Sequence, residues 1–191
     1  MPVFIGLVTD LNLKKDRMDN FPHETKPPAH SRIAELIPGA YFYDAWSVKA
    51  GDPTLPALAQ FQKALAQTPS WVNTCMALRN RVVSWVGLKN LGALDNVNTF
   101  KSASECQPGE RIGIFTLFEN SFGEALLGDR DKHLNVTLSV HRTPAAQDAD
   151  VVVTVTTVVH VNNIFGRLYM LPVAPMHRRI APTVLKAVAR A

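Results

Sequence analysis

The chain has 191 residues, of which 47% are hydrophobic and 19% charged, and 20 basic against 16 acidic side chains give a formal net charge of +4. This composition is typical of a folded soluble protein and excludes the fibrous, disordered and disulfide-rich classes. The two cysteines, Cys75 and Cys106, match no zinc-ligand spacing, so we expect no metal and a cytoplasmic location. No apolar stretch approaches the roughly 20 residues of a membrane span, and no signal-peptide pattern opens the sequence.

The first predicted elements belong to an arm and to the start of a domain. Residues 1–38 contain a Pro-Pro pair that breaks regular structure, and we expect them to precede one domain of residues 39–191. Near the end of this arm, residues 31–37 predict a short helical turn. Residues 40–49 (AYFYDAWSVK) are aromatic and alternate between two faces, which predicts a strand.

A pair of helices is predicted next. Asp52 and Pro53 suit the N-cap and first position of a helix whose apolar residues recur every three or four positions. Thr68 and Pro69 start a second such helix, which ends near Gly87.

Beyond the helix pair the apolar pattern changes to a period of two. It predicts strands over 112–118, 124–128, 132–143 and 151–161, the last two forming a hairpin around a loop. Helical composition then returns, but Pro172 and Pro175 are incompatible with one unbroken helix, so the C-terminal helix is predicted over 181–190.

Strands that cluster rather than alternate with helices predict an α+β fold and argue against a doubly wound parallel sheet. The element order fits a helix-grip arrangement, in which an antiparallel sheet curls around the C-terminal helix and the helix pair closes one end. Such an arrangement usually encloses an apolar pocket.

Standard catalytic motifs for nucleotide, zinc and serine-hydrolase chemistry are absent from the sequence, so no cofactor is expected. The excess of positive charge comes largely from the segment after Asp150, which holds no acidic residue. These cations are not interleaved with aromatic residues, so we expect no nucleic-acid partner. They suit either a solvated helix face or contact with a partner or an anionic membrane surface.

Candidate site residues gather near the ends of the predicted strands. A hairpin turn centred near residues 146 and 147 sets His133 opposite His160, with Cβ atoms about 5 Å apart. Such a pair could contact a ligand or serve as acid and base, or it could simply bond to its neighbours on a wet sheet face. The predicted ligand-binding residues are Glu119, Asp131, His133, His160, Asn162, Arg167 and Tyr169.

The strand alternation places these histidines on the face opposite Leu134, whose neighbours Val136 and Leu138 form the apolar face. The histidines therefore line a cavity only if the polar face is the concave one, or if a bulge reverses the alternation. The mixed charges around Glu119 and Asp131 also suit a salt-bridged loop.

Several strings in the sequence resemble one family. AYFYDAWSV, GDRDKHLNVTLSV and TTVVHVNNIFGRLYMLPVAPMHRRI are similar to the bacterial family of unknown function DUF2867, over about residues 38–181. The resemblance implies a START-like, pollen-allergen-like helix-grip fold. Because that family is uncharacterised, it implies no catalytic residue.

Three functions remain open from the sequence. The first is binding of a small or medium hydrophobic ligand between the sheet and the C-terminal helix. The second is a cyclase- or hydrolase-like enzyme with His133 or His160 as general base beside Asp131 or Glu119. The third is a non-enzymatic interaction domain that meets its partner through the basic C-terminal helix.

Overall fold

A computed structural model describes residues 20–85, 101–145 and 150–190. The first half of the predicted arm, the end of the second predicted helix and the middle of the last predicted loop therefore lie outside the described residues. Within them, one sheet has the strand order β1-β2-β7-β6-β5-β4-β3, and every neighbouring pair is antiparallel. The strands are β1 (His23–Glu24), β2 (Phe42–Lys49), β3 (Arg111–Ile112), β4 (Phe115–Asn120), β5 (Glu124–Arg130), β6 (Leu134–Pro144) and β7 (Val151–Val161).

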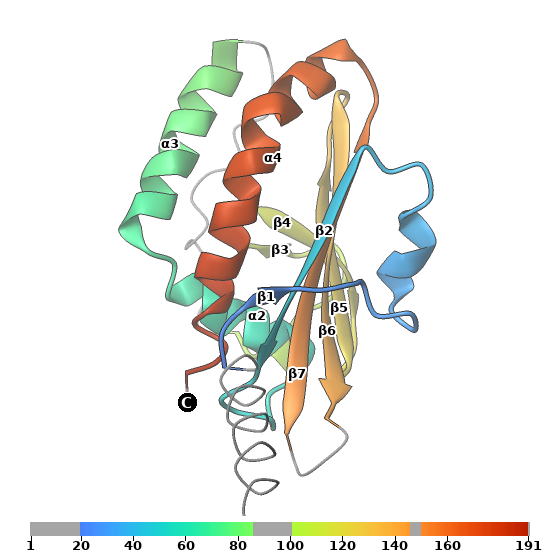
Figure 1. Ribbon diagram of the computed structural model, residues 1–191, viewed down its shortest axis with the longest axis vertical. Coiled ribbons are helices and arrows are strands. Elements are labelled where there is room, and N and C mark those ends of the chain that lie inside the picture. The colour runs from blue at the N-terminus through green and yellow to red at the C-terminus, as the bar shows by residue number, and fades with distance from the viewer. Residues whose placement is uncertain (1–19, 86–100, 146–149, 191) are drawn as a thin grey trace, which may run out of the picture.

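Helices lie on both faces of this sheet. The α-helices are α2 (Ala57–Ala66), α3 (Ser70–Trp85) and α4 (Ile164–Leu185), and the short 3-10 helices are η1 (Arg32–Leu36) and η2 (Ala103–Glu105). Figure 1 shows α4 running along one face of the sheet with α3 beside it, whereas η1 lies on the other face. The predicted α+β class and the C-terminal helix are therefore confirmed.

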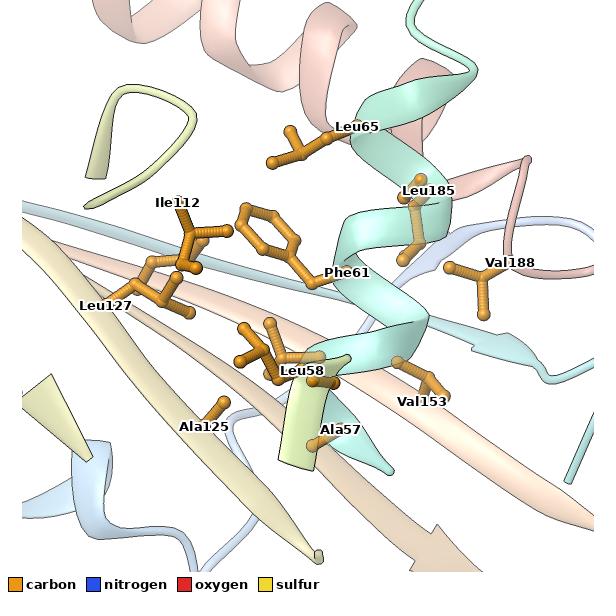
Figure 2. Packing of buried hydrophobic residues seen from close by; sticks show 14 of the residues in the cluster. Ala57, Leu58, Phe61, Leu65, Ile112, Ala125, Leu127, Val153, Leu185 and Val188 are labelled. Atoms are coloured by element: carbon orange, nitrogen blue, oxygen red, sulfur yellow. The ribbon is translucent and has the colours of Figure 1, made fainter. Parts of the chain in front are cut away.

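The main core lies between α2 and the face of the sheet that α4 covers. Figure 2 shows Leu58 and Phe61 of α2 pointing toward Leu127 of β5, with Val153 of β7 nearby. Leu58, Leu127 and Val153 have no exposed surface. The predicted alternation is thus correct, because the apolar residues of β6 and β7 face the helices.

The short helix η1 packs on the opposite face. Ile33 is fully buried there against Leu126 and Val158. Ser31 is the N-cap of η1, and its side chain accepts the Ile33 amide. The Glu124 carboxylate fastens the turn to the sheet, because it accepts hydrogen bonds from the Ser31 hydroxyl, from the Ser139 hydroxyl at 2.6 Å and from the Arg32 amide at 3.0 Å.

Replacing Glu124 with alanine is expected to lower the free energy of unfolding by about 1–2 kcal/mol. Ser31 and Ser139 are buried, and losing their shared acceptor leaves polar groups without full hydrogen bonding. Urea denaturation followed by circular dichroism measures the loss. Glu35→Ala, which removes an exposed carboxylate from η1 itself, is the control. Equal stabilities for the two variants would contradict the role of Glu124.

Two predicted boundaries are wrong for local reasons. Helix α2 begins at Ala57 rather than at Asp52, because Asp52 Oδ1 instead accepts bonds from the amide and the hydroxyl of Thr54, at 2.9 and 2.6 Å. These two bonds hold the pKa of Asp52 below its usual value. The strand predicted over 112–118 is divided into β3 and β4 by a tight turn at Gly113, whose φ of 59° suits glycine.

The prediction that prolines interrupt the C-terminal helix is also wrong. Helix α4 passes through Pro172, Pro175 and Pro182, and Figure 1 shows it as one curved ribbon. Each proline lacks the amide that would bond to the carbonyl four residues earlier. Those carbonyls belong to Leu168, Leu171 and Arg178, whose exposed positions allow water to replace the missing donors. The helix ends at Leu185, short of the predicted end, and turns follow it.

Candidate functional site

An apolar cavity of about 420 Å³ lies between the helices α3 and α4 and the face of the sheet that α4 covers. Residues two apart on the strands form its floor, since they share one face of the sheet. Its apolar walls include Phe42, Leu134, Val136, Leu138, Val155, Val159, Phe61, Leu65, Met76, Leu78, Phe115, Met170, Val173, Met176, Ile180 and Val184. The α4 members recur at intervals of three or four residues, so one stripe of the helix faces the cavity.

The cavity lies at the junction of two separate apolar clusters. One cluster gathers Phe42, Leu134, Val159 and Met170 near the start of α4, and the other includes Leu138, Val153 and Leu185 near its end. Residues of both clusters line the cavity.

Three polar side chains, of Asp44, Thr157 and His177, lie together between these clusters. Asp44 of β2 lies directly opposite Thr157 of β7, and both face α4. His177 of α4 reaches down to them, with its Nδ1 3.0 Å from Asp44 Oδ2 and its Nε2 3.4 Å from Thr157 Oγ1. Trp46 Nε1 also donates to Asp44 Oδ2, at 3.2 Å. The Asp44 side chain is 1% exposed and the His177 side chain 27%, so a buried carboxylate stands behind a partly accessible imidazole.

The chemistry of Asp44 fixes the orientation of this imidazole. An ionised carboxylate only accepts hydrogen bonds, so His177 Nδ1 carries the proton that points to Asp44. The other ring nitrogen, Nε2, then lies on the Thr157 side, and both His177 and Thr157 line the cavity. An imidazole held by a carboxylate in this way can accept a hydrogen bond or a proton from a bound molecule.

A second polar corner lies where α3 meets α4. Arg79 Nε of α3 donates to the hydroxyl of Tyr169 at 2.9 Å, and both residues line the cavity. Asp129 and Asp131 line the same cavity from the end of β5, where Arg111 lies 3.7 Å from Asp129. The charged groups of the lining thus lie on α3 and at the end of β5, apart from the apolar stripe of α4.

His133 lies beside the cavity rather than in its wall. The residue is 6% exposed, and its Nδ1 lies 3.1 Å from Asn163 Oδ1. The same oxygen caps α4 by accepting the amides of Phe165 and Gly166, while Asn163 Nδ2 donates to the Lys132 carbonyl. The Asn163 oxygen is therefore an acceptor, and His133 Nδ1 donates to it. This geometry assigns His133 to the anchoring of α4.

The structure brings together only some of the predicted site residues. Asp131, His133 and Asn162 meet at the junction of β7 and α4, where Asn162 Nδ2 donates to the Asp131 carbonyl at 3.1 Å and the His133 amide donates to Asp131 Oδ1 at 3.0 Å. Asp131 and Tyr169 line the cavity, whereas Arg167 is exposed on α4.

Two predicted residues lie on the other face of the sheet. Glu119 borders a separate hollow of about 280 Å³ and forms an ion pair with Arg32 at 3.4 Å. His160 lies opposite Asn135 rather than opposite His133. The predicted histidine pair is therefore wrong, because the β6–β7 register differs from the prediction by two residues and β6 begins only at Leu134.

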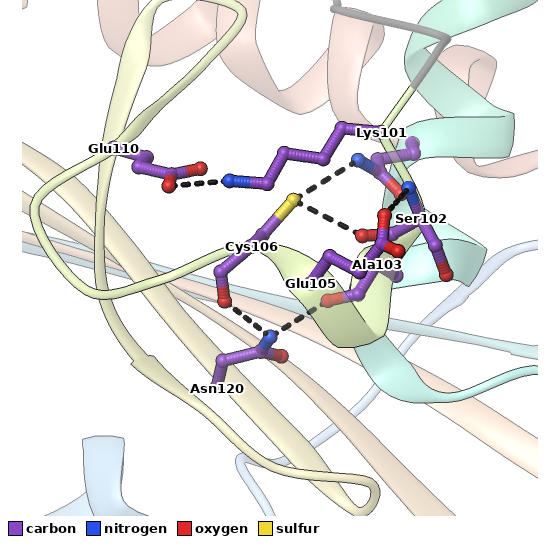
Figure 3. Close-up of polar contacts among 8 residues, drawn as sticks. Lys101, Ser102, Ala103, Glu105, Cys106, Glu110 and Asn120 are labelled. Atoms are coloured by element: carbon purple, nitrogen blue, oxygen red, sulfur yellow. Dashed lines mark hydrogen bonds and ion pairs between the residues drawn. The ribbon is translucent and has the colours of Figure 1, made fainter.

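A further polar cluster surrounds Cys106, outside the cavity. Figure 3 shows Lys101 pairing with Glu110, and Asn120 Nδ2 donating to the carbonyls of Ala103 and Cys106. Burial raises the pKa of the Cys106 thiol, and the negative charge of Glu110 raises it further. A thiol that stays protonated is a weak nucleophile, so this cluster is suited to structure rather than to catalysis.

Asp44 and His177 were not among the site residues predicted from the sequence. Both lie within strings that carry the family resemblance, AYFYDAWSV and the final histidine of LPVAPMH. The available signal was a carboxylate in an otherwise apolar, buried strand, because such a group needs a partner. Nothing in the sequence indicated which of the histidines that partner is.

The chain is thus an α+β protein with an apolar cavity of about 420 Å³ under its C-terminal helix. Residues 36–184 match the model of a family described as a protein of unknown function (DUF2867), and the chain belongs to this family. Comparison of this chain with curated proteins and with solved structures found no match. Among the described helices, none is both long and apolar enough to cross a membrane.

Proposed function

We propose that the protein binds a small or medium hydrophobic ligand in the cavity between the sheet and α4. The supporting observation is the cavity itself, whose 420 Å³ lies within the range of about 300–1,000 Å³ found for small-molecule sites. Its lining is mainly aliphatic and aromatic with a few polar groups, which is the composition of such sites. A cavity in a core lowers stability, because its lining lacks contacts on one side. A ligand would restore those contacts.

The proposal includes a helix-grip, START-like arrangement. It is supported by one antiparallel sheet with a long C-terminal helix along one face and the pair α2 and α3 on the same side (Figure 1). The enzymatic alternative based on His133 or His160 has less support, because neither residue is among those lining the cavity. We favour ligand binding for this reason.

Blocking the cavity is expected to weaken binding of a neutral apolar probe such as Nile red by tenfold or more. Val136→Trp places an indole in the cavity floor. Asn135→Trp adds the same side chain one residue earlier on β6, facing the opposite side of the sheet, and serves as the matched control. Fluorescence titration measures both affinities. The proposal would be contradicted if both variants lost affinity equally. It would also be contradicted if the wild type bound neither Nile red nor naphthalene.

A further inference from the structure

We propose that His177, held by Asp44, accepts a hydrogen bond from a hydroxyl group on the bound ligand. The ligand is then an apolar molecule with a neutral hydroxyl group at one end. This inference rests on the proposed function, since it names the polar end of a molecule whose apolar body fills the cavity. It assigns the recognition role to residues that lie outside the predicted histidine pair.

The geometry supplies one oriented acceptor in the wall. His177 Nδ1 is occupied by Asp44 at 3.0 Å, so the imidazole cannot turn without giving up that bond. The ring of Phe42 holds it from the side, with centroids 5.8 Å apart and planes at 82°. Nε2 is therefore fixed toward Thr157 and the cavity rather than free to rotate.

The existing partner of Nε2 is weak. Thr157 Oγ1 lies 3.4 Å away, at the far end of hydrogen-bond distances, whereas protein hydrogen bonds normally measure about 2.7–3.0 Å. A ligand hydroxyl at the usual distance can therefore replace Thr157 with a net gain. It would also give Nε2 a good partner, which a fully apolar ligand cannot supply.

The charges near His177 argue against an anionic head group. Asp44 places a buried carboxylate directly behind the imidazole, and Asp44 Oδ1 has no hydrogen-bond partner among the described residues. Besides the cation Arg79, whose Nε donates to Tyr169, two further carboxylates, of Asp129 and Asp131, line the same cavity. A ligand carboxylate beside Asp44 would meet a like charge in a poorly solvated wall, whereas a neutral hydroxyl would not.

The test compares naphthalene, 1-naphthol and 1-naphthoate, which share one apolar body, by displacement of Nile red. We expect the wild type to bind 1-naphthol about tenfold more tightly than naphthalene, because a well-formed hydrogen bond to a site of this kind is worth that ratio. The preference should disappear in His177→Leu and in the double variant Asp44→Leu/His177→Leu. The double variant removes both members of the pair and leaves no unpaired buried charge, so it guards against misfolding of the single variant. His160→Leu, a histidine on the opposite face of the sheet, should keep the preference.

Each outcome decides between the two proposals. If neither naphthalene nor 1-naphthol binds, ligand binding in the cavity itself fails. If naphthalene binds but 1-naphthol has no advantage, or if the variants lacking His177 keep that advantage, the role of His177 is overturned while the cavity stands. Tighter binding of 1-naphthoate than of naphthalene would also overturn it, because the site would then recognise an anion. In the wild type, the ¹⁵N signal of His177 Nε2 should shift with 1-naphthol and not with naphthalene.

Discussion

His177→Leu is expected to lower the free energy of unfolding by about 2–3 kcal/mol. The substitution leaves the buried carboxylate of Asp44 with Trp46 as its remaining donor, at 3.2 Å. Removing the partner of a buried carboxylate typically costs about 3–5 kcal/mol, because its charge stays in the interior without compensation. The value here is smaller, since the His177 side chain is 27% exposed and water can reach part of the site. Urea denaturation at neutral pH measures the change.

The double variant Asp44→Leu/His177→Leu is expected to recover most of this loss. Removing both partners replaces the pair by apolar groups between two apolar clusters, and such replacements are often neutral or stabilising. The coupling between the two sites, obtained from both single variants and the double variant, should therefore be large. A double variant whose loss equals the sum of the single losses would show that Asp44 and His177 do not act as a pair.

The face of β6 that packs toward the helices could be predicted from the sequence, whereas the face that borders the cavity stayed open. Leu134, Val136 and Leu138 alternate with polar residues along β6, so any register with the correct parity directs them to the core. Burial of the apolar face dominates the energy of such a strand, which explains why the prediction and the structure agree there.

The register of β6 against β7 could not be predicted in the same way. Strand β7 reads VVVTVTTVVHV, and a shift of two residues still pairs β-branched residues with apolar ones. The two registers are therefore nearly equivalent in side-chain pairing, and the contacts of the neighbouring strands decide between them. The sequence does not distinguish the two registers, and in the observed one His133 and His160 are not opposite each other.

The Asp44–His177 pair lay beyond sequence patterns for a different reason. The two residues are 133 positions apart, and they meet only because β2 pairs with β7 and α4 crosses both strands. The prolines of α4 further concealed it, since they predicted a break where the structure keeps one helix. The site therefore depends on tertiary packing that overrides a local preference.

Gly166→Ala is expected to lower the free energy of unfolding by about 2 kcal/mol, although the same change within an exposed helix usually stabilises it by about 0.5–1 kcal/mol. Gly166 lies in the first turn of α4, against the turn between β5 and β6. A Cβ there would overlap the backbone carbonyl oxygen of His133 and lie 2.9 Å from Val161 Cγ1. A backbone atom cannot move aside as the end of a flexible side chain can, so the start of α4 must shift.

The control for this prediction is Gly123→Ala, where a Cβ would meet no atom within 4 Å, and its stability should stay within about 0.5 kcal/mol of the wild type. Urea denaturation of both variants gives the comparison. The shift in Gly166→Ala should also strain the Asn163 cap, because Asn163 Oδ1 accepts the Gly166 amide at 3.2 Å. Since α4 forms one wall of the cavity, affinity for Nile red should fall together with stability. A Gly166→Ala variant that is more stable than the wild type would instead show that α4 does not approach His133 this closely. The start of α4 would then bound the cavity differently.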